Sequence, residues 1–171
     1  MKTVYLMRHA KSDWGNAQIS DHERPLNARG RHAAKRMGQF MRDVGIAPDT
    51  AFVSTATRTR STWALLSDEA GLAAQAQFID KLYLGAPETY RKLWCALAPD
   101  VGSVLFLGHS PGIEQLAREL CANGADADLT ALQQKFPTGA LAEIRFEEPW
   151  SAIGPGTGRL MRFILPRSFD E

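Results

Sequence analysis

The chain has 171 residues, of which 44% are hydrophobic and 23% charged, and its formal net charge is +1. This length fits one domain and the composition is close to the globular average, which excludes a disordered or fibrous chain, so we expect a single domain over residues 1–171. The nearly neutral charge gives no field that would draw nucleic acid or a membrane surface to the protein, and the apolar amino terminus is too short for a signal segment or a membrane span.

The predicted elements alternate between strands and helices along the chain. Short apolar runs bounded by turn formers predict five strands, at residues 3–7, 51–53, 103–107, 140–146 and 160–165. Apolar residues at helical spacing predict four amphipathic helices, at residues 33–44, 62–70, 87–97 and 113–121. This order predicts an α/β sandwich with a largely parallel sheet, whose ligand site lies at the carboxyl ends of the strands. The last two strands follow one another without a clear helix, so we expect an antiparallel edge.

The sequence offers no pattern for a metal or a nucleotide. Cys95 and Cys121 lie in helix-like apolar patterns without metal-ligand spacing, so we expect two reduced core thiols and a cytoplasmic location. No G-x-x-x-x-G-K-[ST] loop occurs. We therefore expect an activity that needs no cofactor and no metal.

Residues suited to phosphate chemistry follow three predicted strands. Arg8 and His9 follow the first strand, Arg58 follows the second, and His109 follows the strand at 103–107. A neutral imidazole can accept a phosphoryl group, and the planar guanidinium donors fit phosphate oxygens. Each of these residues alone would be read as a structural histidine or a surface arginine, but together they predict a phosphoryl-transfer site.

Four ordered motifs carry a family resemblance. They are LMRHAKSDW (6–14), DHERPLNARGRHAA (21–34), STATRTRST (54–62) and LGHSPGIEQLA (107–117). Together they resemble the histidine phosphatase superfamily and, within it, the SixA-type phosphohistidine phosphatases. The resemblance implies a phosphoglycerate-mutase-like, three-layer α/β/α sandwich. It also implies that Arg8 and His9 form the superfamily's Arg-His pair, with Arg58 as the second phosphate-binding arginine and His109 as the second histidine.

Two departures from the wider superfamily resemble the SixA-type branch. Ala10 replaces the usual glycine after the histidine, and Gly15 stands where an asparagine is expected, with Asn16 one place later. The general acid of larger members also has no match here. Its region reads IDKLYLGAPETY (79–90), whose carboxylates are Asp80 and Glu88, and either or neither could be the acid.

The lack of a recognisable general acid is informative about the substrate. An ester leaves as an alkoxide of very high pKa and needs a proton from the enzyme, whereas the imidazole of phosphohistidine leaves near neutral pKa. We therefore expect a phosphatase whose substrate is a signalling or carrier protein phosphorylated on histidine. His9 is expected to be the nucleophile, and protonated His109 is expected to stabilise the phosphoryl oxygens together with the two arginines. We also expect the protein to be a monomer. The alternatives are a small-molecule phosphomonoesterase or mutase with the same pocket, and a non-catalytic phosphate-reading module.

Further expectations concern the surroundings of the pocket. Ser12 and Arg24 are predicted to line its mouth, and Asp21 to act mainly as loop and cap support. His22 and His32 are predicted to be solvated. Few residues separate the helix ending at 70 from the strand beginning at 103, which leaves little chain for a lid and predicts a shallow, exposed pocket.

Overall fold

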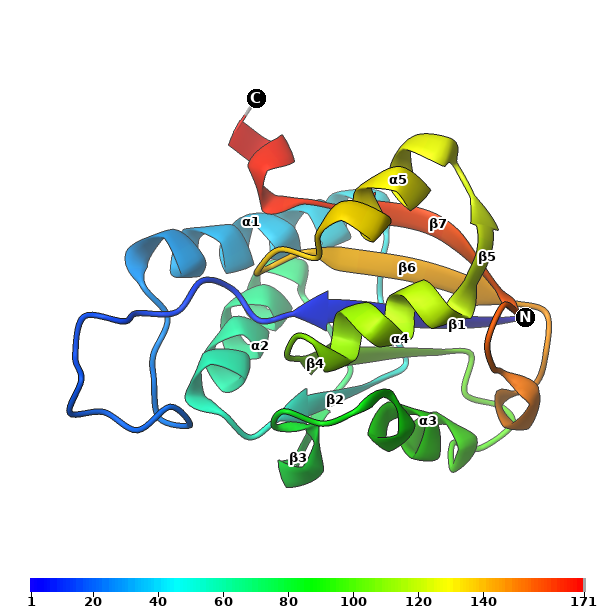
Figure 1. Ribbon diagram of the computed structural model, residues 1–171, viewed down its shortest axis with the longest axis horizontal. Coiled ribbons are helices and arrows are strands. Elements are labelled where there is room, and N and C mark those ends of the chain that lie inside the picture. Colours follow the sequence, from blue (N-terminus) through cyan, green and yellow to red (C-terminus); the bar gives the residue numbers. More distant parts are fainter. Residues whose placement is uncertain (171) are drawn as a thin grey trace.

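A computed structural model describes residues 1–170, and within them seven strands form one sheet in the order β3-β2-β4-β1-β6-β7-β5 (Figure 1). The strands are β1 (Lys2–Arg8), β2 (Thr50–Ser54), β3 (Ala76–Ile79), β4 (Ser103–Gly108), β5 (Cys121–Gly124), β6 (Leu141–Phe146) and β7 (Gly158–Ile164). The α-helices are α1 (Ala28–Val44), α2 (Thr57–Ala70), α3 (Pro87–Cys95), α4 (Gly112–Leu120) and α5 (Asp126–Gln134). Short 3-10 helices lie at η1 (Asp80–Leu82), η2 (Trp150–Ala152) and η3 (Pro166–Asp170).

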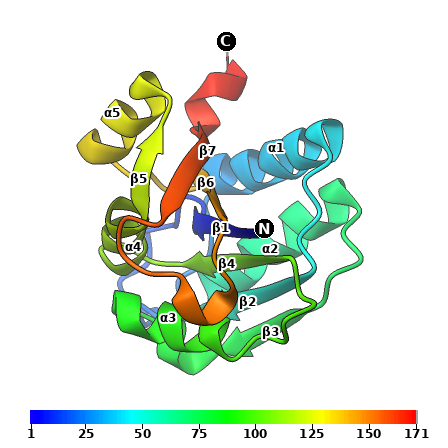
Figure 2. The same cartoon turned by 90° about the vertical axis from the view of Figure 1, so that its right-hand side faces the viewer.

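The continuous apolar run along β1 explains the layers. Val4 and Leu6 face a core shared with α3, α4 and α5, whereas Tyr5 and Met7 face a core shared with α1 and α2. Successive side chains of a strand point to opposite faces, so a strand that is apolar throughout is covered on both sides. Figure 2 shows α1 and α2 on one side of the sheet and α3, α4 and α5 on the other. The predicted α/β class and its sandwich architecture are thus confirmed.

The direction of the strands brings the predicted site together. β3, β2, β4 and β1 are successive parallel neighbours, so their carboxyl ends share one edge of the sheet. β6 is antiparallel to both β1 and β7, and β5 pairs parallel with β7. The antiparallel strand predicted at an edge of the sheet therefore lies inside it, because β7 and β5 extend the sheet beyond β6.

Two strands and one α-helix were not predicted from the sequence, nor were the short 3-10 helices. β3 (AQFI) and β5 (CANG) have four residues each and almost no β-branched side chains, so their strand character depends on pairing at the two edges of the sheet. α5 buries only Leu132 and carries no strong apolar periodicity. The helix predicted to run through residue 121 ends at Leu120, because Cys121 enters β5.

The two cysteines are both free, but they are not two core thiols as predicted. Cys95 is exposed at the end of α3, and Cys121 is half-buried at the start of β5. Burial of the Cys121 thiol raises its pKa to about 12. Its thiol therefore stays protonated and unreactive at neutral pH.

Helix α1 begins five residues earlier than its apolar pattern indicates. The Asn27 side chain accepts a hydrogen bond from the backbone N–H of Gly30 at 2.8 Å and so caps the first turn. The helix ends at Gly45, which adopts the left-handed conformation (φ 79°) that glycine tolerates. The first turn lies against the segment that follows His9, since Asn27 N–H donates to the Lys11 carbonyl at 3.0 Å.

Candidate active site

The four residues predicted from strand ends meet at one edge of the sheet. Arg8 ends β1 opposite Gly108 of β4, so His9 and His109, which follow these residues, lie side by side with ring centroids 5.2 Å apart. Arg58 lies in the first turn of α2, four residues after the end of β2. Because β2, β4 and β1 are adjacent, their carboxyl ends bring two histidines and two arginines into one site.

The hydrogen bond of His9 fixes its tautomer. Its Nδ1 lies 2.7 Å from the Ala10 carbonyl oxygen, which can only accept, so Nδ1 carries the hydrogen and Nε2 keeps a lone pair. The side chain is 6% exposed. Burial above all, with the charges of Arg58 and Arg8 in addition, lowers the pKa of His9 to about 4. The imidazole is therefore neutral at physiological pH, which is the form in which Nε2 can act as a nucleophile.

A threonine hydroxyl joins the His9 segment to α2. Thr62 Oγ1 accepts from the Ala10 N–H at 3.0 Å and donates to the Arg58 carbonyl at 2.7 Å. Thr62 is fully buried. The end of β1 and the first turn of α2 are thereby held in register, which sets the position of His9 relative to Arg58.

His109 is also buried and neutral. Its Nε2 lies 2.7 Å from Ser54 Oγ at the end of β2, and the residue is 2% exposed. Burial, followed by the charges of His9 and Arg58, lowers the pKa of His109 to about 3. The protonated His109 expected from the sequence is therefore not the form of the free protein, and a proton on it would need the negative charge of a bound phosphoryl group.

The two arginines are held in different ways. Arg58 is 6% exposed and donates from Nη1 to the Asp21 carbonyl at 2.7 Å and from Nη2 to Asp21 Oδ2 at 3.1 Å. Arg8 donates from Nη1 to the Phe136 carbonyl at 3.0 Å, and its buried Nε has no partner within residues 1–170. Each guanidinium thus keeps N–H donors that a phosphate oxygen can use.

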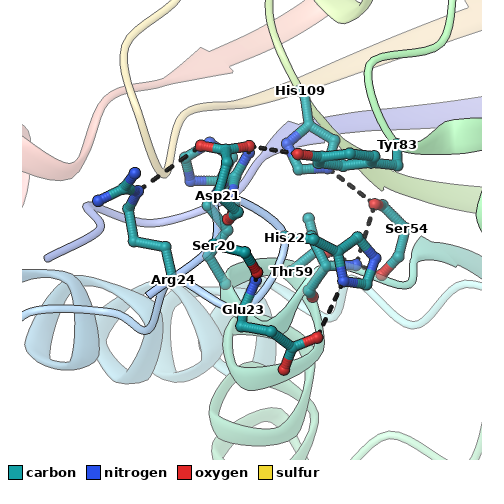
Figure 3. A network of polar contacts seen from close by, with 12 residues as sticks. Ser20, Asp21, His22, Glu23, Arg24, Ser54, Thr59, Tyr83 and His109 are labelled. Atoms are coloured by element: carbon teal, nitrogen blue, oxygen red, sulfur yellow. Dashed lines mark hydrogen bonds and ion pairs between the residues drawn. The ribbon is translucent and has the colours of Figure 1, made fainter. Parts of the chain in front are cut away.

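Asp21 lies at the centre of a polar network that the sequence did not predict. Its carboxylate accepts a hydrogen bond from Arg58. It also accepts from the hydroxyl of Tyr83, and Arg24 Nε lies 3.6 Å from Oδ1 (Figure 3). The Tyr83 hydrogen bond, with the charge and hydrogen bond of Arg58 in addition, lowers the pKa of Asp21 below its usual value. The expectation that Asp21 serves mainly as loop and cap support is therefore wrong.

Tyr83 is a site residue that sequence reasoning missed. Its ring stands edge-on to His109 at 5.5 Å and to His22 at 4.8 Å. His22 Nε2 lies 3.0 Å from Thr55 Oγ1, so His22 is half-buried beside the site and not simply solvated as predicted. His32 is exposed on α1, as predicted.

The remaining candidates differ in their relation to this network. Arg24 stacks on the Trp14 ring at 3.7 Å and belongs to the network through Asp21, whereas Ser12 is buried and pairs with Leu26 in an isolated bridge. Both candidate acids are exposed. Asp80 begins η1, and Glu88 is paired with Arg91 at 3.0 Å. Among the carboxylates considered from the sequence, Asp21 is thus the one that contacts a predicted phosphate-binding residue.

The shallow, exposed pocket stays a prediction. His9, Arg58 and His109 are each at most 6% exposed, whereas the Asp21 side chain, which contacts Arg58, is 44% exposed. Within residues 1–170, no group of three or more His, Cys, Asp and Glu side chains has the arrangement of a metal site. In the same part of the chain, every helix is too short or too polar to cross a bilayer.

Comparisons with known proteins define the class. The profile of the histidine phosphatase superfamily (branch 1) matches residues 4–82. An uncharacterized protein of Mycobacterium tuberculosis (strain ATCC 25618 / H37Rv) is 36% identical over 163 residues, which cover 94% of this chain and all of that protein. The chain therefore belongs to the histidine phosphatase superfamily.

Solved structures show which members it is similar to. A protein from Nakamurella multipartitia, proposed to be the phosphohistidine phosphatase SixA, superposes with a TM-score of 0.83 at 31% identity and covers 96% of both chains. The protein histidine phosphatase SixA complexed with tungstate superposes with a TM-score of 0.79 at 24% identity, covering 98% of this chain and 99% of that one. The predicted resemblance to SixA-type proteins is confirmed at the level of the fold.

Proposed function

We propose that this protein is a phosphatase that removes the phosphoryl group from protein phosphohistidine, through a covalent phosphohistidine on His9 and without a metal ion. The chain acts as one catalytic domain. The observation that carries the proposal is the tautomer of His9: its Nδ1–H donates to the Ala10 carbonyl and leaves the Nε2 lone pair for attack. The similarity to SixA proteins over nearly the whole chain supports the choice of substrate.

The reaction has two displacements. In the first, the Nε2–P bond to His9 forms as the P–N bond of the substrate breaks, and the substrate imidazole departs with the electron pair of that bond. That imidazole leaves as a neutral molecule when its other ring nitrogen carries a proton. In the second, water attacks the phosphorus of phospho-His9, its proton passes to solvent, and inorganic phosphate and neutral His9 are released.

The neighbouring residues supply positioning and charge. The N–H donors of Arg8 and Arg58 that are not used within the protein bind the equatorial oxygens of the phosphoryl group. His109, beside His9, takes up a proton when the phosphoryl dianion enters and donates a hydrogen bond to it. Electrostatic stabilisation of this kind supplies most of the rate in phosphoryl transfer.

The carboxylates favour a P–N bond over an ester. An alkoxide leaving group needs a proton from a carboxylic acid, but the pKa of Asp21 is lowered, so that carboxyl is ionised at neutral pH. Asp80 and Glu88 are exposed, and Glu88 is engaged by Arg91. These residues are poor donors for an ester and are not needed for phosphohistidine.

The test measures both the intermediate and the specificity. A protein phosphorylated on histidine is assayed beside a phosphoserine protein and a panel of sugar phosphates, and the enzyme is quenched during turnover to trap the phosphoenzyme. We expect an acid-labile, base-stable phosphoryl adduct that His9→Ala lacks, and a fall in kcat of several orders of magnitude, on the order of 1,000-fold or more, in that variant.

Either of two results would contradict the proposal and favour a different function. If a sugar phosphate matched or exceeded the phosphohistidine protein in kcat/KM, the protein would be a small-molecule phosphomonoesterase or mutase. If the wild-type protein bound phosphate but gave neither turnover nor an adduct, it would be a phosphate-reading module.

A further inference from the structure

A basic groove lies beside the site but outside the residues that take part in the proposed reaction. It has a volume of about 550 Å³ and is formed by the start of α1, the 135–138 segment and the chain that follows β7. Apolar side chains, among them Pro137, Leu165 and Pro166, also line it. Its basic residues are Lys11, Arg29, His32, Arg36, Lys135 and Arg167.

The charge of the groove contrasts with that of the chain. The whole chain carries a formal charge of only +1, yet Asp170 is the one acidic residue among the described residues that line the groove. Within residues 1–170, none of its lysines and arginines forms an ion pair. Elsewhere in the described chain arginines do find carboxylates, as Arg91 and Arg118 do on α3 and α4. The groove therefore gathers positive charge that no carboxylate of residues 1–170 neutralises through an ion pair.

The same two chain segments, the one that follows His9 and the one at 135–139, border both the groove and the proposed active site. Lys11 is two residues from His9, and Pro137 follows Phe136, whose carbonyl accepts from Arg8 at 3.0 Å. The Gly139 N–H lies 2.8 Å from the His9 carbonyl and 3.0 Å from the Arg8 carbonyl. A molecule that places a phosphorylated side chain on His9 would therefore bring the surface around that side chain over the groove.

The shape and side chains of the groove favour a protein over other polyanions. Phe169 is the one Phe, Tyr or Trp among the described lining residues, and its ring already contacts Phe40 at 5.7 Å and the Arg36 guanidinium at 5.6 Å, so a stacking base would have to compete with these contacts. The groove is also concave with apolar walls, which suits side chains from a folded partner better than a flat bilayer surface.

We infer that this basic groove binds the acidic surface around the phosphohistidine of the protein substrate. The inference rests on the proposed function and extends it, because it assigns substrate recognition to residues outside the phosphate site. Charges at the rim of an interface act mainly on the rate of association, and their effect weakens as salt increases. The groove should thus raise kcat/KM for an acidic protein substrate and leave the chemistry unchanged.

The test compares a protein substrate with the same bond in a small molecule. The substrates are a small acidic carrier protein phosphorylated on one histidine, a version of it with the surrounding Asp and Glu changed to Asn and Gln, and free phosphohistidine. The enzyme variant is Arg29→Glu with Arg167→Glu, since both residues are exposed and neither side chain makes a hydrogen bond within residues 1–170. Arg36 is left intact because it donates to the Phe169 carbonyl.

A matched control carries the same change of charge elsewhere. Lys92→Glu with Arg159→Glu alters two exposed residues, one on α3 across the sheet and one at the start of β7, where Arg159 donates a single exposed hydrogen bond to Asn123 at 3.3 Å. Arg159 is six residues before Leu165 of the groove, which directly follows β7, and six extended residues span about 20 Å. A circular dichroism spectrum and a Tm for each variant confirm that it is folded.

The outcomes separate this inference from the proposed function. We expect Arg29→Glu with Arg167→Glu to lower kcat/KM on the acidic carrier roughly 10-fold or more at low salt, with free phosphohistidine and the neutralised carrier changed less than about twofold. The control should behave like wild type. If variant and wild type had equal kcat/KM on the acidic carrier, the inference that the groove binds the substrate would be wrong, while the proposed function would stand.

Other results overturn the inference in different ways. An equal loss on free phosphohistidine would mean that the variant damages the active site. Binding of single-stranded RNA or of phosphatidylserine vesicles that the variant loses, with carrier hydrolysis unchanged, would assign the groove to another polyanion. If wild-type protein hydrolysed neither carrier nor free phosphohistidine, the proposed function would fail, and this inference with it.

Discussion

Asp21 and Arg58 form a two-point contact, in which the guanidinium donates to both the backbone carbonyl and the carboxylate of the same aspartate, at 2.7 and 3.1 Å. The contact holds Arg58 in a single orientation beside the two histidines. It also places a negative charge close to the two histidines, and this charge opposes the arginines in setting the pKa of both His9 and His109. We therefore expect Asp21 both to position an arginine and to weaken the binding of anions.

Asp21→Asn should strengthen inhibition by inorganic phosphate, vanadate or tungstate. The amide keeps an oxygen that can accept from Arg58, while the negative charge near the bound anion is removed. Loss of one unit charge at this range should lower the inhibition constants roughly 3- to 10-fold. Inhibition constants measured at fixed ionic strength check this, with Asp13→Asn, an exposed change on the same loop, as control. Weaker inhibition than in wild type would show that the carboxylate acts only by holding Arg58.

Tyr83→Phe should raise the pKa of Asp21. The Tyr83 hydroxyl is the largest of the influences that lower this pKa, and the substitution removes the hydroxyl while keeping the ring against His109. A titration of the Asp21 side-chain carbon by ¹³C NMR measures the change directly. Tyr5→Phe, which removes a hydroxyl from β1, should leave the Asp21 curve in place. An Asp21 titration that is identical in Tyr83→Phe and wild type would contradict the network in Figure 3.

Turnover should survive exhaustive treatment with EDTA. The positive charge that phosphoryl transfer requires is supplied in the proposed mechanism by Arg8 and Arg58, whose free N–H donors do not depend on a cation. The measurement is kcat/KM on a phosphohistidine protein before and after dialysis against the chelator. Activity that is lost and returns only when a divalent ion is added would overturn this mechanism.

The sequence was informative where chemistry follows a strand directly. Arg8, His9 and His109 sit at or next to the ends of β1 and β4, so local pattern and the rule that parallel strands share an edge were enough to bring them together. Tyr83 is different. It follows the short η1 helix, and its approach to Asp21 joins segments 62 residues apart. Contacts of this kind depend on how loops pack, and no periodicity in the sequence encodes them.

The same distinction explains why the contact between Asp21 and Arg58 was not predicted. The loop between β1 and α1 brings Asp21 onto Arg58, and no local pattern in the sequence indicates this contact. The positive charge of the groove was likewise not predicted, because the formal net charge of the whole chain is only +1. Its basic residues come from the start of α1, the 135–138 segment and the chain after β7, which only the tertiary structure brings together.

The free energy of unfolding should fall as the pH is lowered from 6.5 towards 4. In the unfolded chain His9 and His109 take up protons near their ordinary pKa of 6.5, whereas in the folded protein burial holds these pKa values at about 4 and about 3. The unfolded state therefore binds more protons in this range, and stability is lost at about 1.4 kcal/mol per pH unit for each histidine. Urea unfolding at a series of pH values measures the slope.

Variants identify the groups responsible for that slope. His9→Asn with His109→Asn should flatten the curve between pH 6.5 and 4, while His32→Gln, at an exposed position of α1, should not. The lowered pKa of Asp21 contributes stability that is lost only as the pH falls below about 4, so it does not enter this range. A double variant whose slope equals that of wild type would show that neither histidine is held neutral by the fold.

Gly30→Ala should destabilise the protein and slow turnover together. A Cβ at Gly30 would lie 2.1 Å from the Lys11 carbonyl oxygen and 2.9 Å from the Lys11 nitrogen. These are backbone atoms of the segment that follows His9, so they cannot move aside as a flexible side chain would, and either α1 or the His9 segment must shift. A forced shift of packed backbone costs typically about 1–3 kcal/mol.

The comparison with Gly154→Ala isolates this effect. Gly154 has no heavy atom within 4 Å of its Cβ position and lies in the loop before β7, so the same substitution meets no clash there. We expect Gly154→Ala to match wild type within about 0.5 kcal/mol, as surface changes usually do, and to keep its kcat. Gly30→Ala should lose both stability and kcat, because its clash displaces Ala10, whose carbonyl fixes the His9 tautomer and whose N–H is held by Thr62. Wild-type kcat in a destabilised Gly30→Ala protein would show that the first turn of α1 supports the fold without positioning His9.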